Sequence, residues 1–549
     1  MDTNNDTFVE KYTSKYEFNR TLLLTNEQDL IFGPNPPSAI GTITWIVHSS
    51  STSTSSSSSL DHLSCILEQR LVQLCVCNPW LLGRIITKDK KGYLAHPSKL
   101  SPQDDKDFIL GNLFVQHDTP IDGLYYTDTT TDISRSYSKL TSLLSKTRCL
   151  LLHKHDLIDE PIFKVVIVPC SNNSSSTTST KFAIIVSMSH LIADGYTYYT
   201  IYNYLMNGGR TSSTGNGRDQ TSPPPTLQVE RIHEFVSLRD ELIGKEESFL
   251  FSKPGFIASL ILGFLYDFNS SMYKSFQEKG TTLLNLLMWK ATPEEKKEEE
   301  ESTISTSCSS GSGDNEDMIC FMIDQDKMNQ FKKDVIVAEN TSTTAEQPHG
   351  DATSTTSRVD FVSSNDVLTN WLFQYSICTQ GLMAINLRNR LLGNKITNVH
   401  AGNYDTTIYY RVPQDTCNTP TLIRQSLLSN NNFHRVHTYD QKPTFYELAS
   451  SNFSLITNWS SFTNANVDMN MDGTQQNPYE YELLLHMPVL DITSSNKMPS
   501  TLAVCVIFRP KPNQLGLMIF GDEEKRLQDI ISAGGGGKNE HASPFLVQS

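Results

Sequence analysis

Residues 187–195 read Ser-Met-Ser-His-Leu-Ile-Ala-Asp-Gly and place a histidine, His190, four positions ahead of an Asp-Gly pair. The run before it, Phe182–Val186, is rich in β-branched residues and predicts a strand. The residues after it, Gly195–Leu205, carry apolar and aromatic side chains at helical spacing. His190 is therefore expected at the end of a strand, where a loop can present it to a cleft.

An imidazole in this position suits general-base catalysis, because an unperturbed histidine titrates close to neutral pH. In acyl transfer from a thioester to an alcohol or amine, the attacking group loses a proton, and His190 would accept it. Asp194 is better placed to order the turn, and Gly195 would let the chain bend into the helix. An Asp-Gly turn between a strand and a helix also occurs as plain structure, so these residues alone leave both interpretations open.

The length and charge of the chain narrow the class of protein. With 549 residues the chain exceeds what one core usually organises, and a hydrophobic content of 38% suffices for two domains. The Gly- and Pro-containing stretch Gly208–Thr226 suits a crossover, so we expect domains at 1–215 and 216–549. The formal net charge of −15, without a basic stripe, argues against a nucleic-acid partner.

The cysteines and the apolar runs indicate whether to expect a metal site, a secreted protein or a membrane-spanning helix. The ten cysteines are scattered and lie mostly in apolar runs, which is typical of reduced core residues, and their spacing predicts no metal site. The polar N-terminus lacks the features of a signal peptide, so a cytoplasmic location is expected. The apolar stretch Phe256–Tyr266 is shorter than the ~20 residues that span a bilayer. It predicts a buried helix, with a membrane-resting or lipid-lining helix as the alternative.

Several polar segments interrupt the pattern and predict solvated loops or disordered insertions, notably Ser49–Ser59, 293–317 and 338–357. Between them, short apolar runs alternate with helical patterns in both halves, so we expect an α/β fold in which sheets are covered by helices. The expected strands and helices outside the His190 region are as follows: strands at Met318–Ile323, Leu382–Leu387, Phe453–Trp459, Thr501–Phe508 and Leu515–Phe520, and helices at Gln325–Val335 and Asn365–Ile377.

Further stretches follow one another in an order that matches the motifs of an acyltransferase family. In chain order they are Leu24-Thr25 with Asp29 ahead of the strand Gly41–Ile46, the run Asn78–Ile85, His190 to Gly195, the helix Ser363–Leu372 with a serine N-cap, Ile385–Arg390 with Gly402-Asn403-Tyr404, the helix around Pro420–Leu427, and Thr457-Asn458-Trp459. With these motifs the chain resembles the BAHD-type acyltransferases, in the larger group that includes chloramphenicol acetyltransferase and the condensation domains of peptide synthetases.

The resemblance implies two chloramphenicol acetyltransferase-like lobes, each a mixed sheet covered by helices, with the active-site channel between them. It implies that His190 is the base and that Asp194 holds the loop. Thr457 and the indole N–H of Trp459 become candidates to bind the developing oxyanion, with a core role as the alternative for Trp459.

Two further residues receive architectural or binding roles from the same resemblance. Arg388 is expected either to form a structural ion pair or to contact the pantetheine-nucleotide donor. Asn403 is expected to shape a turn together with Gly402.

The chain departs from the family pattern in two places. The Asp-Phe-Gly-Trp-Gly motif expected after Trp459 is missing, and a polar insertion, Asn464–Asn477, stands there instead. The doubled histidine common in condensation domains is absent, because Ser189 precedes His190. We therefore expect a distant relative or a separate branch that keeps the base.

The sequence as a whole predicts an acyltransferase that needs no resident cofactor and takes acyl-coenzyme A as co-substrate. A small-molecule hydroxyl or amine would be the acceptor, and the resemblance implies a monomer. Two alternatives stay open: a condensation-type enzyme that uses carrier-bound donors, and a catalytically inactive two-lobed binding protein.

Overall fold

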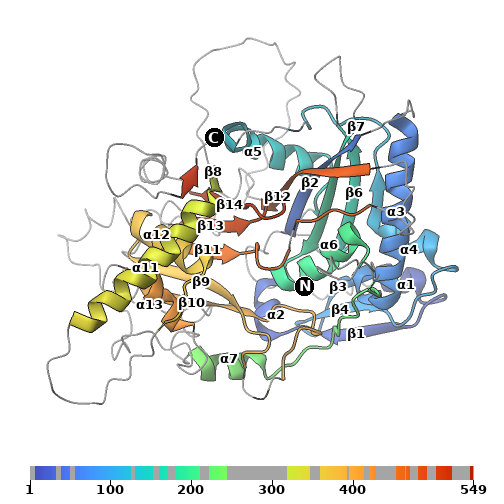
Figure 1. Cartoon of the computed structure of the whole chain (residues 1–549). Coiled ribbons are helices and arrows are strands. Elements are labelled where there is room, and N and C mark those ends of the chain that lie inside the picture. The colour runs from blue at the N-terminus through green and yellow to red at the C-terminus, as the bar shows by residue number, and fades with distance from the viewer. Residues whose placement is uncertain are drawn as a thin grey trace, which may run out of the picture.

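The computed structural model shows a mixed α/β chain. Two mixed sheets and a smaller antiparallel sheet are covered by helices, which confirms the α/β class predicted from the sequence (Figure 1). The structure describes residues 7–31, 39–49, 56–124, 126, 130–151, 160–170, 180–209, 222–243, 318–345, 359–376, 378–391, 393, 395–412, 419–427, 453–463, 465–469, 480–490, 502–521 and 545–547.

The first mixed sheet has five strands and carries His190 at one strand end. Its order is β12 (Glu480–Leu490), β2 (Ala39–Ser49), β7 (Thr180–Ser189), β6 (Phe163–Pro169) and β5 (Phe114–Gln116). Only the β5–β6 pair among these neighbours is parallel. The helices α3 (Ser56–Cys77), α4 (Lys106–Leu113) and α6 (Gly195–Asn207) pack with this sheet (Figure 1).

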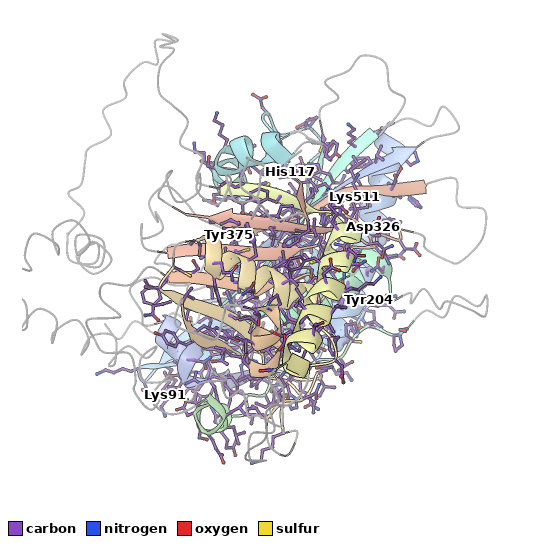
Figure 2. All side chains as sticks on the ribbon, turned by 60° about the vertical axis from the view of Figure 1, so that its left-hand side comes forward. Lys91, His117, Tyr204, Asp326, Tyr375 and Lys511 are labelled. Carbon is purple, nitrogen blue, oxygen red and sulfur yellow. The ribbon has the colours of Figure 1, made fainter. Side chains whose placement is uncertain are left out.

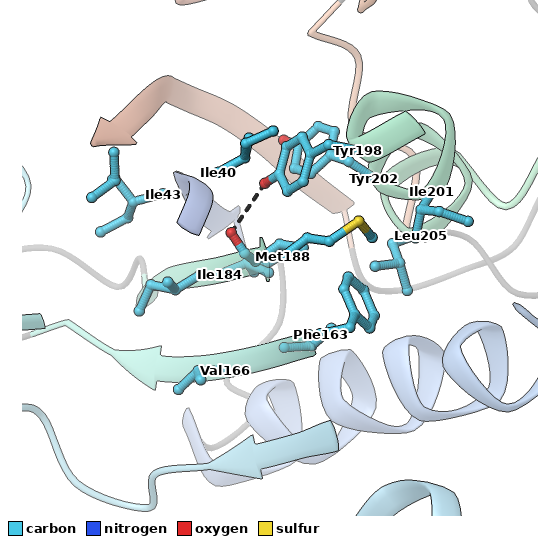
Figure 3. Close-up of a cluster of buried hydrophobic side chains, with 14 of the residues drawn as sticks. Ile40, Ile43, Phe163, Val166, Ile184, Met188, Tyr198, Ile201, Tyr202 and Leu205 are labelled. Atoms are coloured by element: carbon cyan, nitrogen blue, oxygen red, sulfur yellow. Dashed lines mark hydrogen bonds between the residues drawn. The ribbon is translucent and has the colours of Figure 1, made fainter. Parts of the chain in front are cut away.

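Strand β7 is interior to the sheet, and its sequence explains why. Every residue from Phe182 to Ser189 is buried, because the strand pairs with β2 on one side and β6 on the other while both of its faces are covered. On one face, Tyr198, Ile201 and Leu205 of α6 lie close to Met188 of β7 (Figure 3). The strand end before His190 is therefore held by the core.

The second mixed sheet has seven strands. Its order is β10 (Asp405–Arg411), β9 (Gln380–Asn386), β11 (Phe453–Asn458), β13 (Leu502–Phe508), β14 (Leu515–Phe520), β8 (Met318–Ile323) and β15 (Leu546–Val547). One face packs against α11 (Gln325–Ala345), α12 (Ser364–Tyr375) and α13 (Pro420–Ser426). Figure 2 shows α11 and α12 lying in front of these strands, with Asp326 and Tyr375 labelled.

The two faces of the seven-stranded sheet follow the period of two expected for strands. In β14, Leu517 and Ile519 join the core beneath the three helices, whereas Met518 and Phe520 join the core of the five-stranded sheet. The seven-stranded sheet therefore turns its second face toward the half of the molecule that carries His190.

Smaller elements complete the described chain. The antiparallel sheet has the order β1 (Phe18–Leu22), β4 (Lys91–Pro97) and β3 (Arg84–Lys88). The other helices are α1 (Thr7–Tyr12), α2 (Thr25–Ile31), α5 (Thr130–Lys146), α7 (Phe235–Ile243) and a 3-10 turn, η1 (Pro79–Leu82).

One strand crosses the division expected at 215/216. Strand β12 comes late in the chain, yet it pairs antiparallel with β2 and forms the edge of the five-stranded sheet. Pairing between distant segments depends on tertiary packing, so no local sequence pattern predicts it. The proposed domains 1–215 and 216–549 therefore share a sheet.

Two loop predictions were wrong in part. Helix α11 continues through Ala345, so residues 338–345 of the expected insertion 338–357 are helical, with Val337 beside them exposed. Helix α3 begins at Ser56, inside the predicted serine loop, and Ser59 is buried with its hydroxyl 3.0 Å from Nδ1 of His48. Low-complexity composition misled the prediction in both places, because composition and propensity are weak guides that tertiary context can override.

Other predictions fall outside the described residues. These are the insertion 293–317, the apolar stretch Phe256–Tyr266 and most of the insertion Asn464–Asn477. Among the helices of the described part of the chain, none combines the length and the hydropathy needed to cross a bilayer.

Candidate active site

The turn between β7 and α6 places His190 and Asp194. His190 follows the last strand residue directly, and the next three residues, Leu191, Ile192 and Ala193, are buried and anchor the turn in the core. Helix α6 then begins at Gly195 with Asp194 as its N-cap. Because capping satisfies backbone N–H groups that the helix leaves unpaired, the motif's aspartate fixes where the helix starts.

His190 is half-buried, and only one of its ring nitrogens is engaged. Nδ1 lies 3.1 Å from the carbonyl oxygen of Ala193. A carbonyl oxygen can only accept, so Nδ1 carries the proton in the neutral ring and Nε2 keeps its lone pair. Within the described residues Nε2 has no hydrogen-bond partner. The turn therefore holds the imidazole in the tautomer that a general base requires.

Both carboxylate oxygens of Asp194 accept hydrogen bonds that hold the turn in place. Oδ1 accepts from the backbone N–H and the hydroxyl of Thr197, each at 2.9 Å. Oδ2 accepts from the Arg388 guanidinium and from the backbone N–H of Tyr404 at 3.2 Å. The side chains of Arg388 and Asp194 are 0% and 3% exposed, so each charge offsets the other where water does not reach.

Arg388 has no donor left for a ligand. Its remaining N–H groups donate to the carbonyl oxygens of His400 and Gly402, the hydroxyl of Thr197 and the amide oxygen of Asn386. Its guanidinium carbon also lies 4.7 Å from the ring centre of Tyr196 and 5.2 Å from that of Tyr404. These contacts favour the architectural alternative for Arg388 over contact with a donor nucleotide.

A second buried ion pair supports the same turn from the other side. Nε of Arg231 donates to Oε2 of Glu27 at 2.9 Å, and both side chains are 0% exposed. The other guanidinium nitrogens donate to the carbonyl oxygens of Ile192 at 2.9 Å and Ala401 at 2.7 Å. The pair thus ties α2 and the segment after Pro225 to the middle of the His190–Asp194 turn.

Asn403 does more than shape a turn. Its amide nitrogen donates to the carbonyl oxygen of His190 at 2.7 Å, and its backbone N–H donates to Oε1 of Glu27 at 3.2 Å. The neighbouring Gly402 has a φ of +142°, a conformation that side chains disfavour, so this turn does need glycine. Besides lying in the predicted turn, Asn403 therefore contacts the backbone of the candidate base directly.

Gly195 lies at the start of α6 beside two aromatic rings. Its φ is not among the positive values, and the residue is the first of α6. A Cβ at this position would lie 3.4 Å from Cε2 of Phe462 and 3.7 Å from Cδ1 of Trp459. A Cβ here would make ordinary van der Waals contacts with the two rings, so packing does not require glycine at this position, and the bend expected at Gly195 stays a prediction.

The structure brings Trp459 to the start of α6, whereas Thr457 lies further along β11. Trp459 is buried, and its ring meets that of Tyr199 edge-on with 6.0 Å between centroids. Its indole N–H has no hydrogen-bond partner among the described residues. Thr457 pairs in register with Val506 and is half-buried.

Thr457 belongs to a half-exposed strip on the second face of the seven-stranded sheet. Strand register places Leu382, Ala384 and Asn386 of β9 on the face that carries Leu455 and Thr457 of β11. The alternate residues Met383 and Ile385 belong to the helix-covered core. The strip continues onto β10 at the register partners of β9: Asp405 opposite Asn386, and Thr407 opposite Ala384.

Asp405 brings a further carboxylate to this site. It is half-buried at the start of β10, and it interacts electrostatically with His190, Asp194 and Arg388. Burial and the charge of Asp194 raise the pKa of Asp405 to about 6, although His190 and Arg388 act in the opposite direction. In the described part of the chain no hydrogen bond or ion pair joins its carboxylate to another side chain.

Sequence reasoning missed Glu27, Arg231 and Asp405. Glu27 lies in a polar run and Arg231 in a stretch where polar and apolar residues alternate, as at a surface, and only tertiary packing brings the two together. Asp405 did carry a signal, since a charged residue directly after Gly402-Asn403-Tyr404 opens an apolar strand. Among the residues that the structure describes, no group of three or more His, Cys, Asp or Glu side chains is arranged to hold a metal ion.

Comparison with known proteins gives structural similarity only. No family model matches the chain, and no curated protein matches it. F. sporotrichioides TRI101 complexed with coenzyme A and T-2 aligns at 12% identity over 96% of this chain and 99% of that chain, with a TM-score of 0.45. The TRI3 trichothecene 15-O-acetyltransferase from Fusarium sporotrichioides aligns at 11% identity over 94% of each chain, with a TM-score of 0.47.

A third solved structure, the first condensation domain of the CDA synthetase, aligns at 9% identity over 92% of this chain and 91% of that chain, with a TM-score of 0.44. Similarities at this level say nothing about the substrates of this chain or the roles of its residues.

Proposed function

We propose that this chain is an acyltransferase in which His190 is the general base. The observation that carries the proposal is the state of the imidazole: Nδ1 lies at hydrogen-bond distance from the carbonyl oxygen of Ala193, Nε2 has no partner among the residues that the structure describes, and the ring is half-exposed. Two buried ion pairs, Asp194–Arg388 and Glu27–Arg231, fix the turn that bears it. A preorganised base at a strand end is what proton abstraction from an acceptor needs.

In the proposed reaction, a hydroxyl or amine of the acceptor attacks the carbonyl carbon of a thioester while its proton passes to Nε2 of His190. The tetrahedral intermediate then collapses, the carbon–sulfur bond breaks, and the thiolate takes the proton from the imidazolium. No acyl-enzyme forms. The indole N–H of Trp459 and the hydroxyl of Thr457 are the proposed donors to the oxyanion, and Asp194 with Arg388 holds the loop.

The proposed donor is acyl-coenzyme A and the proposed acceptor is a small molecule, with the two lobes of the chloramphenicol acetyltransferase-like group forming the site between them. The cytoplasmic location and the monomeric state expected from the sequence remain predictions.

A thiol-release assay tests the proposal. Wild type, His190→Ala and the exposed-histidine control His233→Ala would be incubated with short, long and aromatic acyl-coenzyme A donors and pooled alcohols and amines. We expect release with at least one donor, a loss of roughly 10²–10⁴-fold in His190→Ala, and no change in His233→Ala. A parallel arm with acyl-pantetheine donors examines carrier-type substrates.

The outcomes separate the alternatives. His190-dependent release from acyl-pantetheine alone would favour the condensation-type enzyme with carrier-bound donors. Absence of His190-dependent release from every donor, with all variants folded by circular dichroism, would contradict the acyltransferase proposal and favour the inactive binding protein.

A further inference from the structure

Two hydrogen-bond acceptors near His190 have no side-chain donor among the described residues. Asn403 is 3% exposed, and its amide oxygen has no hydrogen-bond partner in the described part of the chain, whereas its amide nitrogen donates to the carbonyl oxygen of His190. That contact also fixes which end of the amide is the oxygen, since a carbonyl cannot donate. The carboxylate of Asp405 is the second acceptor, and within the described residues it too lacks a side-chain donor.

The position of Asp405 follows from three anchors around it. The backbone N–H of Tyr404, its neighbour, donates to Asp194, and Asn403 holds the backbone of His190. Across the sheet, Asp405 pairs in register with Asn386, whose amide oxygen accepts from Arg388. Asp405 therefore lies on the half-exposed strip, within electrostatic range of the candidate base.

The charge balance of the site leaves Asp405 uncompensated. Arg388 and Asp194 neutralise each other, as do Arg231 and Glu27. All five N–H groups of Arg388, and four of the five of Arg231, donate to protein acceptors. A half-buried carboxylate without a partner is costly unless a cation or several N–H donors reach it. The ligand that satisfies this requirement carries positive charge close to the reacting group.

We propose that Asp405 is a specificity residue that binds an ammonium group of the acceptor, so that the acceptor class is a small molecule with a protonated amine a few bonds from its nucleophilic hydroxyl or second amine. The inference rests on the proposed function for the location of the reacting group. The ammonium keeps its proton and donates to Asp405, with the Asn403 oxygen as a second acceptor. The nucleophile is the other group, whose proton goes to Nε2 of His190.

Equilibrium binding without a donor tests this assignment on the full chain. Isothermal titration calorimetry would measure the dissociation constants of straight-chain amino alcohols with three to six carbons. The diols of the same length would be measured for comparison. Proteins would be wild type, Asp405→Asn, and the exposed-carboxylate control Asp122→Asn. We expect at least one amino alcohol to bind wild type about tenfold more tightly than its diol, a factor that corresponds to ~1.4 kcal/mol.

In Asp405→Asn the preference should fall to within about twofold, a difference worth ~0.4 kcal/mol, while Asp122→Asn keeps the wild-type preference. Unchanged binding of the diol shows that Asp405→Asn is folded. The assignment is overturned if no amino alcohol is preferred by wild type, or if Asp405→Asn keeps the preference.

Turnover separates this inference from the function on which it rests. His190-dependent thiol release with diols, without any preference for amino alcohols, would overturn the role of Asp405 and leave the acyltransferase standing. An Asp405-dependent preference in binding, without thiol release from any donor, would support the ammonium site and contradict the acyltransferase.

Discussion

Replacing Arg231 with methionine should destabilise the protein strongly. The substitution removes the ion pair with Glu27, whose side chain is 0% exposed, and it leaves the carbonyl oxygens of Val229, Ala401 and Ile192 without their donor. Breaking a buried pair on one side costs about 3–5 kcal/mol, because an uncompensated charge stays in the interior. We expect the free energy of unfolding to fall by that amount, measured by urea denaturation with tryptophan fluorescence.

Two further variants identify the cause of the loss. The double variant Glu27→Gln/Arg231→Met no longer has the buried negative charge. Its free energy of unfolding should therefore be at least about 1–2 kcal/mol higher than that of Arg231→Met. Lys327→Met removes a cation from a solvent-exposed pair with Asp324 and should cost less than about 1 kcal/mol. If Arg231→Met stays within about 1 kcal/mol of wild type, or if the double variant is no more stable than the single one, the reasoning is refuted.

Two more predictions concern the cores. His486 is fully buried among hydroxyl groups, and burial lowers its pKa to about 3. Below about pH 6.5 the histidine is protonated in the unfolded chain but stays neutral in the folded chain. The free energy of unfolding should therefore be highest above that pH and fall by roughly 1.4 kcal/mol for each pH unit below it. Urea denaturation at several pH values should show this slope in wild type and a shallower one in His486→Gln; equal slopes would contradict it. A Cβ on Gly83 would lie 2.6 Å from Leu94 Cδ1 and 2.8 Å from the Trp80 carbonyl oxygen, whereas one on Gly111 in α4 meets nothing within 4 Å. Gly83→Ala should therefore lower the free energy of unfolding by about 1–3 kcal/mol and with it the melting temperature, whereas Gly111→Ala should raise the melting temperature slightly. A reversed order of the two melting temperatures would show that the packing around Gly83 is looser than described.

Local patterns predicted the elements around His190 well. The strand before it, the helix after it and a serine N-cap at residue 363 or 364 follow from short-range periodicity and capping, and the structure confirms them, with Ser363 as the cap. Asp194 as an ordering residue also follows from its place at a helix start, and its contacts agree with that interpretation.

Long-range features were beyond the sequence. The pairing of β12 with β2 and the ion pair between Glu27 and Arg231 join residues that are hundreds of positions apart, and neither leaves a local signature. The two rings beside Gly195, those of Trp459 and Phe462, likewise come from a distant segment of the chain. Serine-rich and polar composition hid the start of α3 and the end of α11, because serine, threonine and asparagine are weak helix formers and give no local helix signal there.

The central claim is that His190 abstracts the acceptor proton during direct acyl transfer. The most direct measurement follows an isotopically labelled acyl group by mass spectrometry, from acyl-coenzyme A to the acceptor, with intact-protein mass recorded in the same reaction. We predict label in the acceptor and none on the wild-type protein, and a transfer rate lower by roughly 10²–10⁴-fold in His190→Ala. Label held covalently on the protein during turnover, or a transfer rate in His190→Ala within about tenfold of wild type, would contradict the account.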